Sequence, residues 1–144
     1  MNHTKVMNHT KVINSPSLLQ WALRSNAVFS LVSAAVLIAS PELIGQLMGF
    51  EMPWLYQAIG AGLLLFAIQL LILAQLKAIP LLLTRMACYA DFSWVVITLI
   101  LFVVGYSHIP NEGLLLLSII AGFVATFGGL QLRGVKLIER ANIR

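Results

Sequence analysis

Residues 86–104 read MACYADFSWVVITLILFVV, and this stretch decides the fold. It is apolar and close to the ~20 residues that a helix needs to cross a bilayer. It also contains Asp91, which lies six residues after Arg85. An ionisable group at membrane depth is rare and is a functional-site hypothesis by default. The stretch therefore predicts a membrane helix in which Asp91 is the residue to explain.

Asp91 does not prevent this helix from entering a membrane. An aspartate at the centre of a helix costs roughly 2.5–3.5 kcal/mol on the insertion scale, whereas Val, Ile, Leu and Phe each contribute about 0.3–0.6 kcal/mol in favour. The nine such residues in 95–104 together contribute roughly 3–5 kcal/mol. The apolar part of the stretch therefore offsets the acid.

The composition extends this prediction to the whole chain. Of 144 residues, 60% are hydrophobic and 10% are charged, and the mean hydropathy is +0.93. A soluble domain carries roughly 25% charged residues. The basic residues do not alternate with aromatic ones on a polar face, so nucleic acid is not expected as a partner. The expected partner is the lipid bilayer.

The hydrophobic runs predict an all-α, polytopic membrane protein. We expect four transmembrane helices in an up-down bundle, over residues 18–38, 54–76, 84–104 and 114–132. Between the first two, Ser40-Pro41-Glu42 has the cap, the proline and the acid that begin a helix. This short helix should lie in the membrane interface and end at Gly49. Residues 15–132 form the predicted bundle.

The two ends of the chain are predicted to be cytoplasmic tails. Residues 1–14 contain MNHTKV twice, so translation from Met1 and from Met7 are both open, and we expect disorder there. Residues 133–144 form a basic tail. All nine Lys and Arg lie on or near one predicted side, and the loops at 40–53 and 105–113 have none. This asymmetry places both termini in the cytoplasm.

Four polar residues are expected to form a cluster in the cytoplasmic half of the bundle. Each predicted span offers one of them, at about 7–12 Å from the charged or aromatic residue that marks its cytoplasmic end, at 1.5 Å of rise per residue. The cluster consists of Asn26, Gln69, Asp91 and Thr126.

Helical spacing assigns an inward face to each span. Two of these faces carry polar groups, and they consist of Asn26, Ser30, Ser33 and Leu37 in the first span and of Thr84, Cys88, Asp91, Val95 and Thr98 in the third. Small residues, which concentrate where membrane helices pack, define the other two. These are Ala58, Gly62, Leu65 and Gln69 in the second span, and Ala121, Ala125 and Gly129 in the fourth.

The role of the cluster leaves alternatives open. Arg24 is a possible charge partner of Asp91, but it is three residues from Trp21, so its long side chain can instead snorkel to the cytoplasmic headgroups. The cluster itself is either a polar cavity for a ligand or a proton, or a hydrogen-bond network that fixes the register of the helices.

Several catalytic arrangements are missing from the sequence. Cys88 is the single cysteine and there is no CxxC pair. No histidine lies inside a predicted span, which excludes a bis-histidine haem site, and there is no P-loop, GxGxxG motif, di-metal carboxylate motif or Ser-His-Asp arrangement. We therefore expect no enzyme, no metal site and no cofactor.

Three segments carry a resemblance to a known group of proteins. They are LRSNAVFS at residues 23–30, LLFA at 64–67 and DFSWV at 91–95. Through them the chain resembles a set of small, uncharacterised bacterial four-helix membrane proteins, over most of its length after Ser15. In size and layout it is also loosely similar to the DoxX-like family. The resemblance implies a bacterial inner-membrane protein and assigns no functional residues.

Together these observations predict a small integral membrane protein that is not an enzyme. It would act as an accessory or helper subunit through helix packing, either with copies of itself as a homo-oligomer or with a membrane-protein partner. The alternative is a small proton-coupled transporter or polar-ligand binder that uses Asp91.

Overall fold

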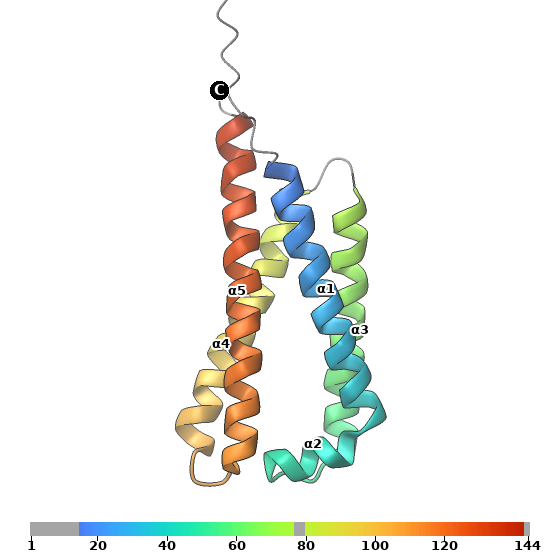
Figure 1. The fold of residues 1–144 in the computed structure, drawn as a ribbon, viewed down its shortest axis with the longest axis vertical. Coiled ribbons are helices and arrows are strands. Elements are labelled where there is room, and N and C mark those ends of the chain that lie inside the picture. The colour runs from blue at the N-terminus through green and yellow to red at the C-terminus, as the bar shows by residue number, and fades with distance from the viewer. Residues whose placement is uncertain (1–14, 77–79, 143–144) are drawn as a thin grey trace, which may run out of the picture.

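A computed structural model describes residues 15–76 and 80–142 of the chain (Figure 1). The predicted tail at residues 1–14 lies outside this range. In order along the chain, the elements are α1 (Ser15–Ala39), α2 (Pro41–Met48), α3 (Pro53–Gln75), α4 (Leu81–Gly105) and α5 (Asn111–Asn142). The predicted all-α fold is confirmed, since the four long helices are each apolar and long enough to cross a membrane.

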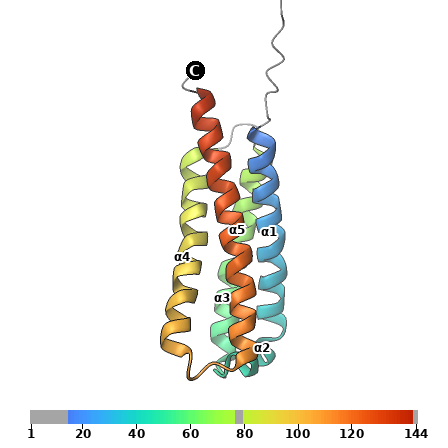
Figure 2. The same ribbon diagram turned by 60° about the vertical axis from the view of Figure 1, so that its left-hand side comes forward.

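The long helices are arranged in space in the order α3, α1, α5, α4 (Figures 1 and 2). The most extensive packing joins α1 to α3, where buried Ala27, Ala34, Ala67 and Ala74 allow the backbones to approach closely. α5 packs on α1 and on α4. By contrast, α3 and α4 follow each other in sequence but make almost no close backbone contact. The bundle is therefore open along one side.

The core lies in the half of the bundle where α1 begins and α5 ends. There all four long helices contribute side chains that are almost fully buried. Toward the opposite end, Figure 1 shows α4 slanting away from α3. The bundle is thus closed at one end and opens toward the other. The core cluster consists of Leu19, Leu23, Ala27, Leu70, Leu73, Ala74, Ala87 and Val135.

The short helix α2 crosses the open end of the bundle (Figure 1). Pro41 lies at its start and Gly49 ends it with a φ of 68°, as the sequence predicted, although Ser40 makes no side-chain capping hydrogen bond. Its C-terminal end is fixed on α3 by the Tyr56 hydroxyl, which donates to the Phe50 carbonyl at 2.8 Å. On the other side Gly113 of α5 lies so close to the Leu47 carbonyl that a Cβ there would clash with its oxygen.

The last helix differs from the prediction at its C-terminal end. The predicted fourth span ended at residue 132, and residues 133–144 were expected as a basic tail for which a helical continuation along the membrane surface was one possibility; α5 continues through residues 133–142 without a break. The continuation has a physical reason, because Val135 is buried against the core of α1 and α3. Amphipathic packing of this kind stabilises a helix beyond its apolar span.

Candidate functional site

Asp91 is buried at the centre of a hydrogen-bonded network that joins three helices. Only 2% of its surface is exposed, and Asn26 and Gln131 are equally enclosed. The Asn26 amide donates to Asp91 Oδ2 at 2.8 Å, and the Gln131 amide donates to the same oxygen at 3.2 Å. Asp91 of α4 is therefore bonded to α1 on one side and to α5 on the other.

Two further residues complete this arrangement. The Cys88 thiol, one turn before Asp91, donates to Gln131 Oε1 at 3.7 Å, which is a weak bond of the kind that thiols make. Gly128 of α5 packs on Asp91 itself, since a Cβ at Gly128 would be 3.4 Å from the Cβ of Asp91. We refer to Asn26, Cys88, Asp91 and Gln131 as the polar network.

The structure brings together two of the four residues predicted to cluster. Asn26 and Asp91 meet directly. Gln69 and Thr126 are both exposed on the outside of the bundle, so their predicted place in the cluster is wrong. Thr126 does not need a partner on another helix, because its hydroxyl donates to the Gly122 carbonyl of its own helix at 2.8 Å.

The inward face predicted for the second span is also wrong, and the face predicted for the fourth span, with Ala121, Ala125 and Gly129, is only half-buried. In α3 the face of Ala58, Gly62, Leu65 and Gln69 is exposed, and the buried side chains lie elsewhere on the helix. In α5 the buried row is Val124, Gly128, Gln131 and Val135, and a Cβ at Gly129 would touch nothing within 4 Å. Small residues are enriched where membrane helices pack, but they are also tolerated next to lipid. Their presence alone therefore does not show which face of a helix is buried.

The faces defined by polar residues were predicted correctly. Asn26 and Ser30 in α1, and Thr84, Cys88, Asp91 and Thr98 in α4, are buried. The remaining members of the two faces, Ser33, Leu37 and Val95, are half-buried. Polar groups are costly in hydrocarbon unless they find a partner, which gives them a clear preference for the interior. Hydroxyls also find partners locally, as Thr84 and Thr98 do on carbonyls four residues earlier.

Arg24 is not the charge partner of Asp91 in this structure. Its side chain is exposed on α1, as the snorkelling alternative requires. Among the described residues, the ion pair is the one between Arg85 of α4 and Glu139 of α5. The Asp91 carboxylate is therefore held by neutral amides.

Gln131 is the member of the polar network that the sequence analysis missed. It stands two residues before Arg133, so it was assigned to the end of the predicted fourth span. Because α5 continues to Asn142, Gln131 lies well inside the helix and is fully buried. Gln131 is three residues from Gly128 and four from Val135, and this helical spacing is the pattern in the sequence that could have placed it on the buried face.

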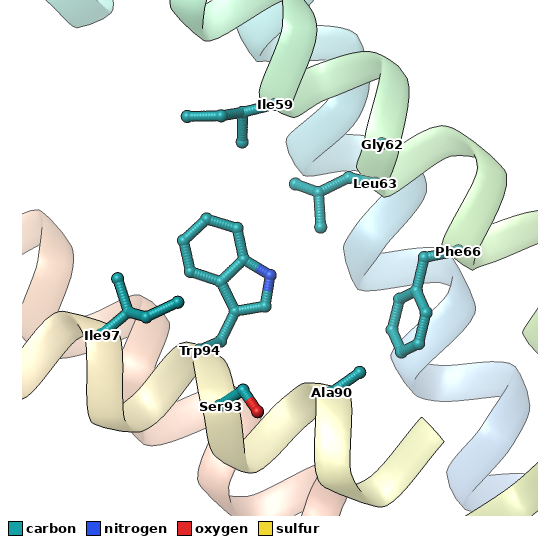
Figure 3. Close-up of a pocket in the computed structure, with 8 residues that line it drawn as sticks. All are labelled: Ile59, Gly62, Leu63, Phe66, Ala90, Ser93, Trp94 and Ile97. Carbon is teal, nitrogen blue, oxygen red and sulfur yellow. The ribbon is translucent and has the colours of Figure 1, made fainter. Parts of the chain in front are cut away.

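An apolar groove runs between α3 and α4 on the open side of the bundle (Figure 3). Its volume is about 400 Å³. Figure 3 shows the Trp94 ring extending from α4 into the space between the two helices. The residues that line this α3–α4 groove are Ile59, Gly62, Leu63 and Phe66 of α3, and Ala90, Ser93, Trp94 and Ile97 of α4.

A second groove lies between α4 and α5, toward the end of the bundle where α5 terminates. Its volume is about 350 Å³, and it is amphipathic. The Arg85–Glu139 ion pair joins its two walls. The residues that line this α4–α5 groove are Arg85, Cys88, Tyr89 and Phe92 of α4, and Leu132, Val135, Lys136 and Glu139 of α5.

The polar network lies apart from the α3–α4 groove, which has none of its members in the lining. Over residues 15–76 and 80–142 there is no group of three or more His, Cys, Asp or Glu side chains that could hold a metal ion. The chemistry available to the network is hydrogen bonding through two amides, a thiol and a carboxylate. No protein-family model, curated protein or solved structure matches this chain.

Proposed function

We propose that this protein is a non-enzymatic accessory subunit of the bacterial inner membrane that packs a transmembrane helix of a partner protein into its α3–α4 groove. The observation that carries this proposal is that α3 and α4 make almost no close backbone contact with each other. The other neighbouring pairs of long helices pack directly on each other. A partner helix in the groove would supply the packing that this side of the bundle lacks.

The lining of the groove suits a helix. Gly62, Ala90 and Ser93 are small, and small residues allow the backbones of membrane helices to approach closely. A Cβ at Gly62 would meet nothing within 4 Å, so that part of the wall is free to receive a partner. Trp94 offers a large aromatic surface beside these small residues, and aromatic anchors of this kind dominate many interfaces.

The distribution of charge supports an orientation with both termini in the cytoplasm. The described cations, Arg24, Arg85, Arg133, Lys136 and Arg140, lie in the half of the bundle where α1 begins and α5 ends. The opposite end carries Glu42, Glu51 and Glu112 without a described Lys or Arg. By the positive-inside rule, this asymmetry favours a cytoplasmic location for the positively charged end.

Transport through Asp91 has weaker support from the geometry. A binding site for a polar ligand requires space around its polar groups, whereas Asp91, Asn26 and Gln131 are packed against one another with almost no exposed surface. We therefore assign to the network the role of joining α1, α4 and α5.

Photo-crosslinking combined with one groove-filling substitution tests the proposal. A photoreactive amino acid at position 59 or 97, on opposite walls of the groove, should crosslink in cells to one recurrent membrane protein. The same amino acid at Val103, which is 84% exposed on α4 outside the groove, should not. Gly62→Leu should fill the groove and abolish the crosslink.

Gly122→Leu is the matched control, because a Cβ at Gly122 on α5 also meets nothing within 4 Å. It should leave the crosslink intact. Adducts to lipid alone, adducts to a second copy of this chain, or an equal loss of crosslinking in both variants would each contradict a partner helix in this groove.

A further inference from the structure

The α4–α5 groove combines positive charge with an apolar floor. Arg85 and Lys136 provide two cations, and Glu139 provides one carboxylate. The groove therefore carries an excess of positive charge, and Arg133 and Arg140 stand on α5 within one turn of Lys136. A binding partner for such a groove should be anionic.

The ion pair orients Arg85 but leaves most of its N–H donors free to bind an anion. Glu139 bonds to one terminal nitrogen of Arg85, and a guanidinium has five N–H donors. The Arg85 side chain keeps 49% of its surface exposed. Among the described residues Lys136 has no carboxylate within ion-pair distance. Both cations thus retain donors for an anion at the mouth of the groove.

The lining changes from charged to apolar along the helix axis. Tyr89 and Phe92 follow Arg85 by four and seven residues, so they lie about 6 and 10 Å deeper along α4. On α5 the order is matched, since Leu132 lies one turn deeper than Lys136. Tyr89 is 70% exposed, and a phenol is suited to the boundary between headgroups and acyl chains.

We infer that the α4–α5 groove binds one anionic phospholipid, with its phosphate at Arg85 and Lys136 and an acyl chain along Tyr89, Phe92 and Leu132. Basic pockets between membrane helices on the cytoplasmic side are known to hold anionic headgroups. The apolar floor favours a lipid over a free phosphate. This inference does not depend on the α3–α4 groove, which lies on the other side of α4.

Native mass spectrometry of the full-length protein tests this inference. The protein is exchanged into detergent with phosphatidylglycerol, with phosphatidylcholine of the same acyl chains, or with inorganic phosphate. We expect one phosphatidylglycerol to be retained, in preference to phosphatidylcholine, and no adduct with phosphate. Lys136→Gln should lower the preference about five-fold, as removal of one cation near an anionic surface should.

Arg24→Gln is the control for this experiment, because it removes the same charge from an exposed position on α1. It should leave the preference unchanged. Lys136 is exposed and outside the core, so its substitution should not unfold the protein, and a circular dichroism spectrum checks this. Equal retention of the two lipids, equal effects of the two variants, or an adduct with phosphate alone would overturn the inference.

Discussion

The hydrogen bonds of Asp91 connect helices that otherwise have little contact. α4 makes almost all its close backbone contacts with α5, yet the Asn26 amide reaches Asp91 from α1 at 2.8 Å. A carboxylate that accepts two amide donors in a nearly dry site is constrained in both rotamer and depth. Register is therefore the property that this residue controls.

A double-mutant cycle on Asn26 and Asp91 measures the strength of this connection. Asn26→Ala and Asp91→Ala should each lower the free energy of unfolding by about 1–3 kcal/mol, because each removes a buried hydrogen bond. Asp91→Ala leaves the Asn26 amide without its partner, whereas Asn26→Ala leaves Asp91 with the bond from Gln131 alone. The coupling between them should be about 0.6–1.7 kcal/mol, as for other hydrogen bonds between membrane helices. Reversible unfolding in mixed micelles, followed by circular dichroism, provides the measurement.

Thr126→Ala is the appropriate comparison for this cycle. Its hydroxyl is exposed and bonded within its own helix, so the substitution should change the free energy of unfolding by less than about 0.5 kcal/mol. Strictly additive effects of Asn26→Ala and Asp91→Ala would show that their hydrogen bond contributes nothing to stability.

Among the helices, α2 links α3 to α5 at the open end of the bundle. The connection that follows α2 is bonded to α3, because Phe50 accepts a hydrogen bond from Tyr56, and α2 itself lies against the first turn of α5 at Gly113. These contacts hold α3 and α5 together at the end where α4 slants away from α3 (Figure 1).

Gly113→Ala should displace α2 from α5. The new methyl group would clash with the Leu47 carbonyl oxygen, which is part of the backbone rather than of a mobile side chain. Overpacking of this kind costs about 1–3 kcal/mol, which thermal unfolding in detergent can detect. Gly129→Ala, at a position with open space around it, should be neutral or slightly stabilising. Equal melting temperatures for the two variants would contradict this account of α2.

The position of each helix could be predicted from sequence. For α3 and α5, the face that is buried could not. Hydropathy locates spans because lipid requires about 20 apolar residues, and Pro41 and Gly49 delimit α2 locally. The buried face of a helix can be predicted from polar residues only where these residues need a hydrogen-bond partner, as Asn26 and Asp91 do. The membrane-spanning parts of α3 and α5 carry apolar or small residues at most positions around the helix, and lipid tails are as apolar as such residues, so hydrophobicity does not show which face is buried. For this reason the exposed Gln69 was predicted to belong to the cluster, and the buried Gln131 was left out of it.

At the scale of the molecule, the charge asymmetry makes a prediction about orientation. A cysteine in place of His108, in the connection between α4 and α5, should react with a membrane-impermeant maleimide in intact spheroplasts. A cysteine appended after Arg144 should react only after permeabilisation. The native Cys88 is 2% exposed, so it should stay silent in both. Labelling of the appended cysteine in intact spheroplasts would reverse the proposed orientation.

The polar network also has a consequence for biosynthesis. Asp91 and Asn26 are 65 residues apart, so the Asn26 amide is already in the membrane when Asp91 emerges. Gln131 follows 40 residues later, which at 5–20 residues per second is about 2–8 s of translation. During that interval α4 lacks α5, the helix it packs on most closely. Until α5 is made, Asn26 is therefore the one of the two amide donors that Asp91 can meet, and the last helix adds Gln131 and completes the network.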